Sequence, residues 1–195
     1  MKLLHWLLLP FQTINGFVLQ LGRAVAIAAI ALMVVAILIQ VFFRYVLNNP
    51  LPWPDEAARF AMLWMTGLIA PLAYRRGGFV AIDMLVRALP ERAAALLSLV
   101  LLAIAGIVLG WGIDIGMSEV TGFMSRAKTA SLYYVNLDLE WVKVPRRWMM
   151  MSFFVGVVLL FLVNVELFLR SLITVLGGGD DLADLGTPED EIMAE

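Results

Sequence analysis

The sequence predicts an all-α integral membrane protein with four transmembrane helices, accompanied by amphipathic segments at the membrane interface. Hydrophobic residues make up 62% of its 195 residues, charged residues only 15%, and the mean hydropathy is +0.90. Soluble domains are close to half apolar and a quarter charged. The apolar residues also gather in runs of about 20 residues, which on an α-helix match the ~30 Å hydrocarbon thickness of a bilayer.

Residues 1–22 precede the first span and are predicted to form a retained segment at the membrane interface. Lys2 and the mainly apolar stretch after it resemble the start of a signal peptide, but no small-residue cleavage site follows. Pro10, Gln12 and Asn15 lead instead into a full-length span. We therefore expect this segment to remain part of the protein.

The four spans are predicted from apolar runs and from the residues that bracket them. Residues 24–43 contain one polar side chain, Gln40, and are flanked by Arg23 and Arg44. The two arginines lie ~31 Å apart on an α-helix, which matches the hydrocarbon thickness. A membrane domain is therefore predicted over residues 23–176, with spans at about residues 24–44, 54–74, 91–114 and 146–176.

The second span is predicted to begin at Pro54, because the proline-rich connection before it cannot continue a helix. Proline suits the first helical position, and Asp55 and Glu56 complement the positive end of the helix dipole. Arg59 lies one turn further on, so these charges form either an ion cluster at the membrane interface or part of a partner interface. For Arg44 we favour an ion pair with Asp55 or Glu56 across the short connection.

Residues 79–89 are predicted to form a short helix in the membrane surface, between the second and third spans. Asp83 and Arg87 lie four residues apart on one charged face, and the remaining positions are mainly apolar. In the third span, Gly106 and Gly110 form a small-xxx-small pair, a pattern that lets another helix approach closely. This pair is a candidate helix-packing face.

A longer polar connection, predicted over residues 114–147, joins the third and fourth spans. Apolar and polar side chains alternate over residues 135–141, which predicts a short extended piece. The fourth apolar run is ~43 Å long as a helix, so it must tilt or protrude. Glu166 and Arg170 lie one turn apart near its far end, where a snorkelling ion pair is favoured over a proton relay.

Several classes of chemistry are excluded by residue types. The tail, residues 177–195, is acidic and has too few apolar residues to pack, so we expect it to be disordered and to bind no nucleic acid. The chain has no cysteine, which excludes disulfides and thiolate metal sites, and its single histidine, His5, lies outside the predicted spans. Common phosphate-binding, metalloprotease and serine-nucleophile motifs are absent from the sequence, so no enzyme activity, cofactor or metal site is predicted.

The middle thirds of the predicted spans are interpreted as apolar, or as carrying only Ser, Thr and Gly. A transporter that binds solute or sodium itself usually needs ionisable groups or broken helices near the bilayer midplane. Two classes of function therefore remain. One is a scaffold or accessory subunit of a transporter, and the other is a structural subunit of another multi-subunit inner-membrane complex.

Interfacial residues between the first and third spans occur in a distinctive order. They are Arg44 and Tyr45, the turn at residues 50–56 with Trp53, Asp55 and Glu56, the basic helix end at residues 74–78, Asp83, and the pair Leu89 and Pro90. In this order on a four-span chain, they resemble the small membrane subunit of tripartite ATP-independent periplasmic (TRAP) transporters, the DctQ-like family. The resemblance covers about residues 20–175. The family often has a histidine shortly before the aspartate, where this chain has Phe79 and Val80.

The resemblance implies a subunit that works with a large multi-span permease and a periplasmic solute-binding protein, in sodium-driven uptake of a small organic anion or related solute. The small subunit would be a fixed scaffold in the bacterial inner membrane, in contact with membrane lipids. Basic residues are divided equally between the two sides, and the arginines within residues 75–92, together with the resemblance, favour cytoplasmic termini. The candidate structural or interface residues are Arg44, Trp53, Asp55, Glu56, Arg59, Asp83, Gly106 and Gly110.

Overall fold

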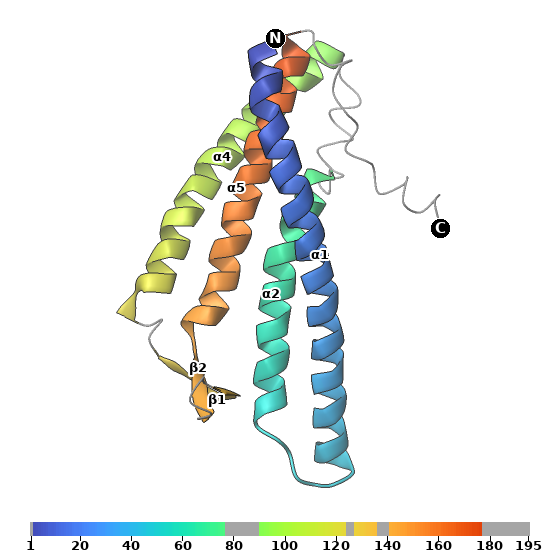
Figure 1. Cartoon of the computed structure of the whole chain (residues 1–195), viewed down its shortest axis with the longest axis vertical. Helices are drawn as coiled ribbons and strands as arrows, with labels where there is room; N and C mark the ends of the chain where they lie inside the picture. The colour runs from blue at the N-terminus through green and yellow to red at the C-terminus, as the bar shows by residue number, and fades with distance from the viewer. Residues whose placement is uncertain (1, 77–89, 124–126, 136–140, 177–195) are drawn as a thin grey trace, which may run out of the picture. The chain divides into compact units, whose positions relative to one another are not determined.

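The computed structural model describes residues 2–76, 90–123, 127–135 and 141–176 (Figure 1). Within them, four helices are long and apolar enough to cross a membrane, which confirms the predicted class. The elements are, in chain order, α1 (Lys2–Tyr45), α2 (Trp53–Arg75), α4 (Glu91–Thr121), β1 (Lys128–Val135), β2 (Trp141–Pro145) and α5 (Arg147–Val175). The predicted surface helix at residues 79–89, with Asp83, and the acidic tail at residues 177–195 lie outside the described residues.

The chain divides into two compact units, and each of the four helices contributes a segment to both. The first unit comprises Met1–Gln20, Ala70–Trp111 and Val158–Glu195. The second unit comprises Leu21–Ile69 and Gly112–Val157, and it includes the β1–β2 hairpin. The two units are described separately below.

Helix α1 is continuous over 44 residues, so the predicted boundary at residue 22 is not a break in the backbone. Pro10 lies inside the helix and cannot donate a backbone hydrogen bond. In the first unit, Leu8, Asn15 and Leu19 are nevertheless buried, and their packing holds this part of the chain in helical form. That the segment lies in the membrane interface stays a prediction.

Helix α4 extends to Thr121, beyond its predicted end at residue 114. Its polar residues were interpreted as the start of a connection, but the helix accommodates them. The Ser118 hydroxyl donates to the carbonyl of Ile115, and the Thr121 hydroxyl donates to that of Met117, so both groups are satisfied within the helix. Gly116 also brings α4 close to α5 in the second unit, since a Cβ there would lie 3.1 Å from the ring of Phe154.

The connection between α4 and α5 contains an antiparallel hairpin that the sequence predicted only in part. Strand β1 pairs with β2 so that Tyr133 lies opposite Lys143 and Val135 lies opposite Trp141. The extended piece predicted at residues 135–141 therefore has a strand at either end, and residues 136–140 are outside the described part of the chain. The buried Thr129 hydroxyl contacts the carbonyl oxygen of Val144 at 2.8 Å and joins the two strands further along.

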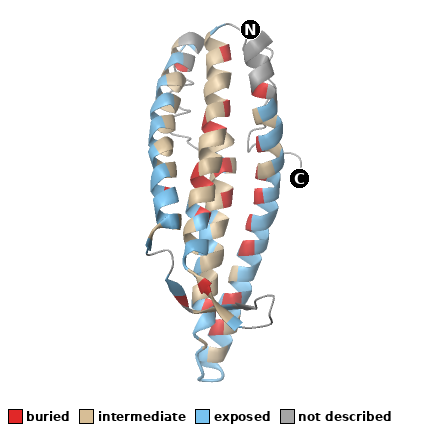
Figure 2. Ribbon diagram, turned by 60° about the vertical axis from the view of Figure 1, so that its left-hand side comes forward, coloured by how far each residue is buried: buried red, intermediate tan, exposed pale blue. Residues whose placement is uncertain are grey.

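Burial differs strongly between α4 and α5 (Figure 2). In the most apolar stretch of α5, 33% of residues are buried, whereas none are in the corresponding stretch of α4. The exposed side chains of α4 include Ile104, Ile107, Val108 and Trp111, all large and apolar. A surface of this kind suits lipid or another membrane-embedded chain, because neither requires the apolar groups to face water.

Candidate functional site

A fully buried carboxylate connects three helices in the first unit. The side chain of Glu166, on α5, is 0% exposed. Its Oε2 accepts a hydrogen bond of 2.7 Å from Asn15 Nδ2 on α1, and its Oε1 accepts bonds of 2.7 and 3.2 Å from Arg75 Nη2 and Nε on α2. Charge-assisted hydrogen bonds are among the stronger polar contacts in proteins. We call Asn15, Arg75 and Glu166 the buried triad.

The structure corrects the sequence interpretation of Glu166 in two respects. Arg170 Nε does lie 3.5 Å from Glu166 Oε1, one turn along α5, but the shorter ion pair is the one with Arg75 at 2.7 Å. A fully buried carboxylate is also not a snorkelling group. In addition, Asn164 lies in the middle third of α5 and Glu166 at the edge of it, so the description of all span centres as free of other polar groups was wrong.

Asn164 extends the polar contacts of the first unit to α4. Its Oδ1 accepts a hydrogen bond from the Tyr74 hydroxyl on α2, and its Nδ2 donates to the carbonyl of Leu102 on α4 at 3.0 Å. A Cβ at Gly106 would lie 3.0 Å from the same Nδ2, so a glycine permits this close approach of α4 and α5. A Cβ at Gly110, by contrast, would have no atom within 4 Å. The two glycines of the predicted pair therefore have different surroundings. Gly106 packs against another helix of the chain, whereas Gly110 faces open space.

The contacts of the buried triad link helices of the first unit. Both oxygens of Glu166 accept hydrogen bonds from side chains of other helices, which satisfies a charge that would otherwise be costly to bury. In the described part of the chain, no group of three or more His, Asp or Glu residues is placed to hold a metal ion. The sequence signal for the triad was present in Asn15 and Glu166, two polar residues within apolar helices, but nothing in it linked them to Arg75.

A second carboxylate anchors the hairpin in the second unit. Glu56 Oε2, on the first turn of α2, accepts a hydrogen bond of 2.7 Å from the backbone N–H of Ser131 on β1. The Ser131 hydroxyl lies 2.6 Å from the same oxygen and 2.8 Å from the carbonyl oxygen of Pro52. The start of α2 and strand β1 are thus fixed to each other by one serine.

Removing the Glu56 carboxylate should therefore release the hairpin while leaving the helices intact. For Glu56→Ala we expect a loss of about 1.5–3 kcal/mol in the stability of hairpin docking, because hydrogen bonds to a charged acceptor are lost. Amide hydrogen exchange over residues 127–135 should become correspondingly faster. Asp55→Ala is the matched control, since Asp55 lies in the same turn but is exposed. Equal exchange in the two variants would contradict the anchor.

The remaining predicted residues lie near this end of α2 but do not form the expected ion pairs. Arg44 lies over the ring of Tyr45, 5.8 Å from its centroid, and within the described residues it forms no ion pair with Asp55 or Glu56. Of the two carboxylates predicted as its partner, Glu56 instead accepts a hydrogen bond from Ser131. Asp55 and Arg59 are exposed on α2 and stay candidates for a partner contact.

A close crossing of α2 and α5 in the second unit was not predicted. A Cβ at Gly67 would lie 2.5 Å from the backbone oxygen of Ser152, and one at Gly156 would lie 2.9 Å from the Cα of Gly67. The two backbones therefore touch where neither residue has a side chain. The predicted glycine pair on α4 has a local spacing of four residues, whereas Gly67 and Gly156 lie on different helices and share no local spacing.

These features define a helical multi-pass membrane protein whose buried polar groups hold its own helices together. The family model for "Tripartite ATP-independent periplasmic transporters, DctQ component" matches residues 33–174, and the chain belongs to this family. The match decides between the two classes of function that the sequence left open. Together with the four helices it places the protein in the bacterial inner membrane, as a membrane component of a TRAP transporter. Neither the curated proteins nor the solved structures gave a match to the chain.

Proposed function

We propose that this protein is a fixed scaffold for the large permease subunit of its transporter, which takes up a small organic anion or related solute with sodium. A periplasmic solute-binding protein would deliver the solute. The observation that carries the scaffold role is the buried triad, because both oxygens of its carboxylate are held by side chains of other helices, Asn15 and Arg75. A carboxylate that is bound by side chains of other helices is not available to coordinate a transported ion or solute.

The exposed face of α4 supports a large membrane-embedded contact. Helix association in lipid depends on close packing, to which glycine contributes by letting backbones approach. Gly110 and Trp111 are both part of the face that no other part of the described chain covers closely. This face is our candidate for contact with the large subunit.

We also propose that both termini are cytoplasmic, which places the β1–β2 hairpin on the periplasmic side. The support is the group of arginines near residues 75–92 and the family resemblance. Reporter fusions after Gly78 and Gly178 test this orientation. A periplasmic signal from either fusion would reject it.

Proteoliposomes provide the test of the scaffold role. With binding protein, solute and a sodium gradient supplied, vesicles that contain only this chain should show uptake no greater than empty vesicles. Vesicles that also contain the large subunit should take up solute, and omission of the binding protein should abolish that uptake. Sodium-dependent uptake by this chain alone would show that it holds a transport site of its own.

A further inference from the structure

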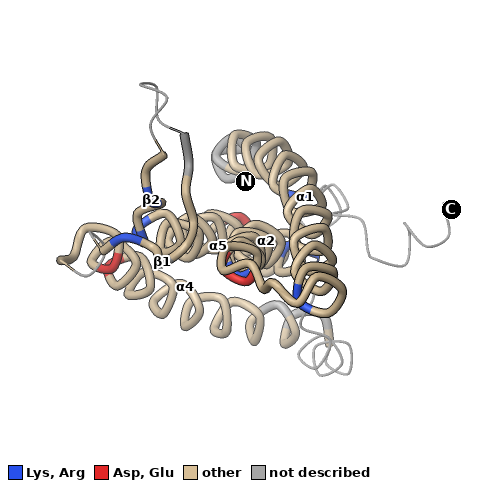
Figure 3. The backbone as a smooth tube through the Cα atoms, turned by 90° about the horizontal axis from the view of Figure 1, so that it is seen from below, with Lys and Arg blue, Asp and Glu red and all other residues tan. Residues whose placement is uncertain are grey.

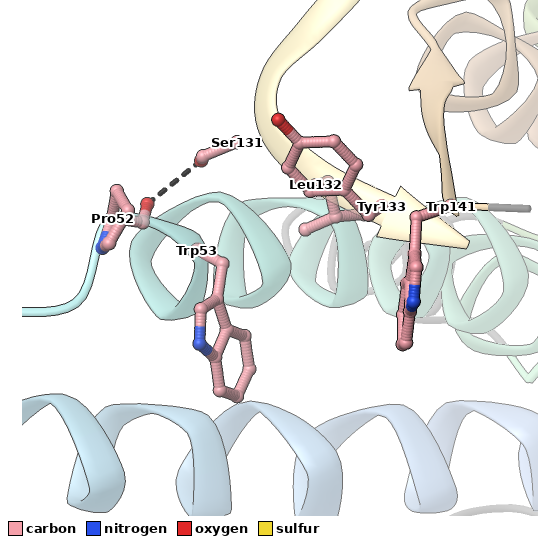
Figure 4. A pocket seen from close by; sticks show the side chains of 6 residues that line it. All are labelled: Pro52, Trp53, Ser131, Leu132, Tyr133 and Trp141. Atoms are coloured by element: carbon pink, nitrogen blue, oxygen red, sulfur yellow. Dashed lines mark hydrogen bonds between the residues drawn. The ribbon is translucent and has the colours of Figure 1, made fainter. Parts of the chain in front are cut away.

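An aromatic cavity lies beside the start of α2 in the second unit (Figure 4). Its volume is about 730 Å³, and the indole rings of Trp53 and Trp141 point to the same side of it. Its lining is mainly apolar, and its polar groups include the Tyr133 hydroxyl and the Ser131 hydroxyl, which is bound to Pro52 and Glu56. The cavity is open, since Trp53, Tyr133 and Trp141 are 40%, 51% and 72% exposed. The lining residues are Pro52, Trp53, Ser131, Leu132, Tyr133 and Trp141.

A lysine lies on the same face of the hairpin as two of the cavity's aromatic rings. Side chains alternate along a strand, so Trp141 and Lys143 project from one face of β2. Tyr133 lies directly opposite Lys143 in the register, and the Lys143 Nζ is 5.7 Å from the centroid of its ring. The ammonium group therefore lies beside one of the rings that line the cavity.

Both charged residues that the structure describes on the two strands of the hairpin are lysines, Lys128 on β1 and Lys143 on β2 (Figure 3). The sequence also has Asp138 and Glu140 between the strands, outside the described residues. Of the two carboxylates on the first turn of α2, Glu56 accepts hydrogen bonds from Ser131, and only Asp55 is exposed. A lysine beside an apolar cavity matches the two ends of an anionic lipid.

The position along the span supports the same ligand. Trp53 is the first residue of α2, whose 23 residues are about enough to cross the hydrocarbon layer. The cavity therefore lies where a span ends. Tryptophan and tyrosine prefer this level of the membrane, where acyl chains meet phosphate groups.

We propose that this cavity binds a single anionic phospholipid, with an acyl chain against Trp53 and Trp141 and the phosphate at Lys143. The lipid would fill the space between the hairpin and the start of α2. Both of these elements are already joined by the Glu56–Ser131 anchor, so the cavity is built before the lipid enters. The site is independent of the scaffold role and needs no partner protein.

Brominated phospholipids test the site, because bromine on an acyl chain quenches tryptophan fluorescence only at short range. Two variants of the full chain are needed, one that retains only Trp53 and Trp141 and one that retains only Trp111, with phenylalanine at the other tryptophans. Trp111 on α4 is 69% exposed, close to the 72% of Trp141, so it is matched in exposure and reports ordinary lipid contact. Each variant is reconstituted in phosphatidylcholine vesicles with increasing amounts of brominated phosphatidylglycerol or, separately, brominated phosphatidylcholine.

We expect half of the Trp53 and Trp141 fluorescence to be quenched at an about five-fold lower mole fraction of brominated phosphatidylglycerol than of brominated phosphatidylcholine. A preference of this size is what one lysine near an anionic lipid contributes. Trp111 should show no such preference. Lys143→Gln should abolish the preference, whereas the matched change Lys128→Gln, on the same hairpin, should leave most of it.

Three results would overturn the proposal. Equal quenching of Trp53 and Trp141 by the two lipids would indicate ordinary boundary lipid. An equal loss of preference in Lys143→Gln and Lys128→Gln would indicate diffuse charge attraction rather than a site. Quenching of Trp111 without quenching of Trp53 and Trp141 would show that the cavity is closed to lipid or filled by polypeptide.

Discussion

Arg75→Ala is expected to destabilise the protein more than any other change to a charged residue that the structure describes. The substitution leaves Glu166 fully buried without its 2.7 Å ion-pair partner. Removing one member of a buried pair typically costs about 3–5 kcal/mol, because the other charge stays in a medium of low polarity. Arg170, at 3.5 Å, offsets part of this loss, so we expect about 3 kcal/mol. A thermal unfolding midpoint in detergent, followed by circular dichroism, is the measurement.

Two further experiments, a matched control and an exchange of the two charges, distinguish the loss of the Arg75–Glu166 ion pair from a general effect of removing an arginine. Arg59→Ala removes an exposed arginine from the same helix and should change stability by less than about 0.5 kcal/mol. The double variant Arg75→Glu with Glu166→Arg should recover part of the loss caused by Arg75→Glu alone. If the two single changes simply add, the ion pair does not contribute to stability.

The buried triad also explains why composition predicted the spans but not their connections. Apolar runs and flanking arginines report only the chain's affinity for the bilayer, and they located four helices of suitable length. Asn15 and Glu166 are separated by 151 residues, and no local pattern carries information about such a contact. Basic residues are common at the ends of membrane spans, so the sequence around Arg75 does not indicate its partner. Its role depends on where α2 ends relative to Glu166, which is a property of packing.

The hairpin illustrates the same limit at shorter range. Alternation over residues 135–141 predicted extended backbone from local period-two spacing. Val135 and Trp141 are strand residues, and residues 136–140 lie outside the described part of the chain. The pairing of Tyr133 with Lys143 depends on the register of the two strands. A shift of two residues keeps every side chain on the same face, so alternation alone does not distinguish such registers. For Glu56, the residue pattern indicated the helix-dipole contribution at the start of α2 but not Ser131, 75 residues away. One of the two carboxylates predicted as a partner for Arg44, Glu56, is therefore bound to the hairpin instead.

Gly67→Ala and Gly156→Ala are expected to disturb the crossing of α2 and α5, although each adds only one methyl group. At Gly67 the new Cβ would lie 2.5 Å from the backbone oxygen of Ser152, and at Gly156 it would lie 2.8 Å from that of Gly67. Backbone atoms cannot turn aside as a flexible side chain can, so the helices themselves must separate. We expect a loss of about 2–3 kcal/mol from either change, at the upper end of the usual range for overpacking.

Gly110→Ala is the matched control for this crossing, because it makes the same chemical change in another apolar helix. No atom lies within 4 Å of the added methyl group at Gly110, and alanine favours helix over glycine by about 1 kcal/mol in water. The control should therefore leave the unfolding midpoint in detergent unchanged or raise it, while Gly67→Ala and Gly156→Ala lower it. The double variant should lose less than the two single variants together, since the first methyl group already separates the helices and makes space for the second. Full additivity, or equal midpoints for all three single variants, would show that the two backbones do not touch at these glycines.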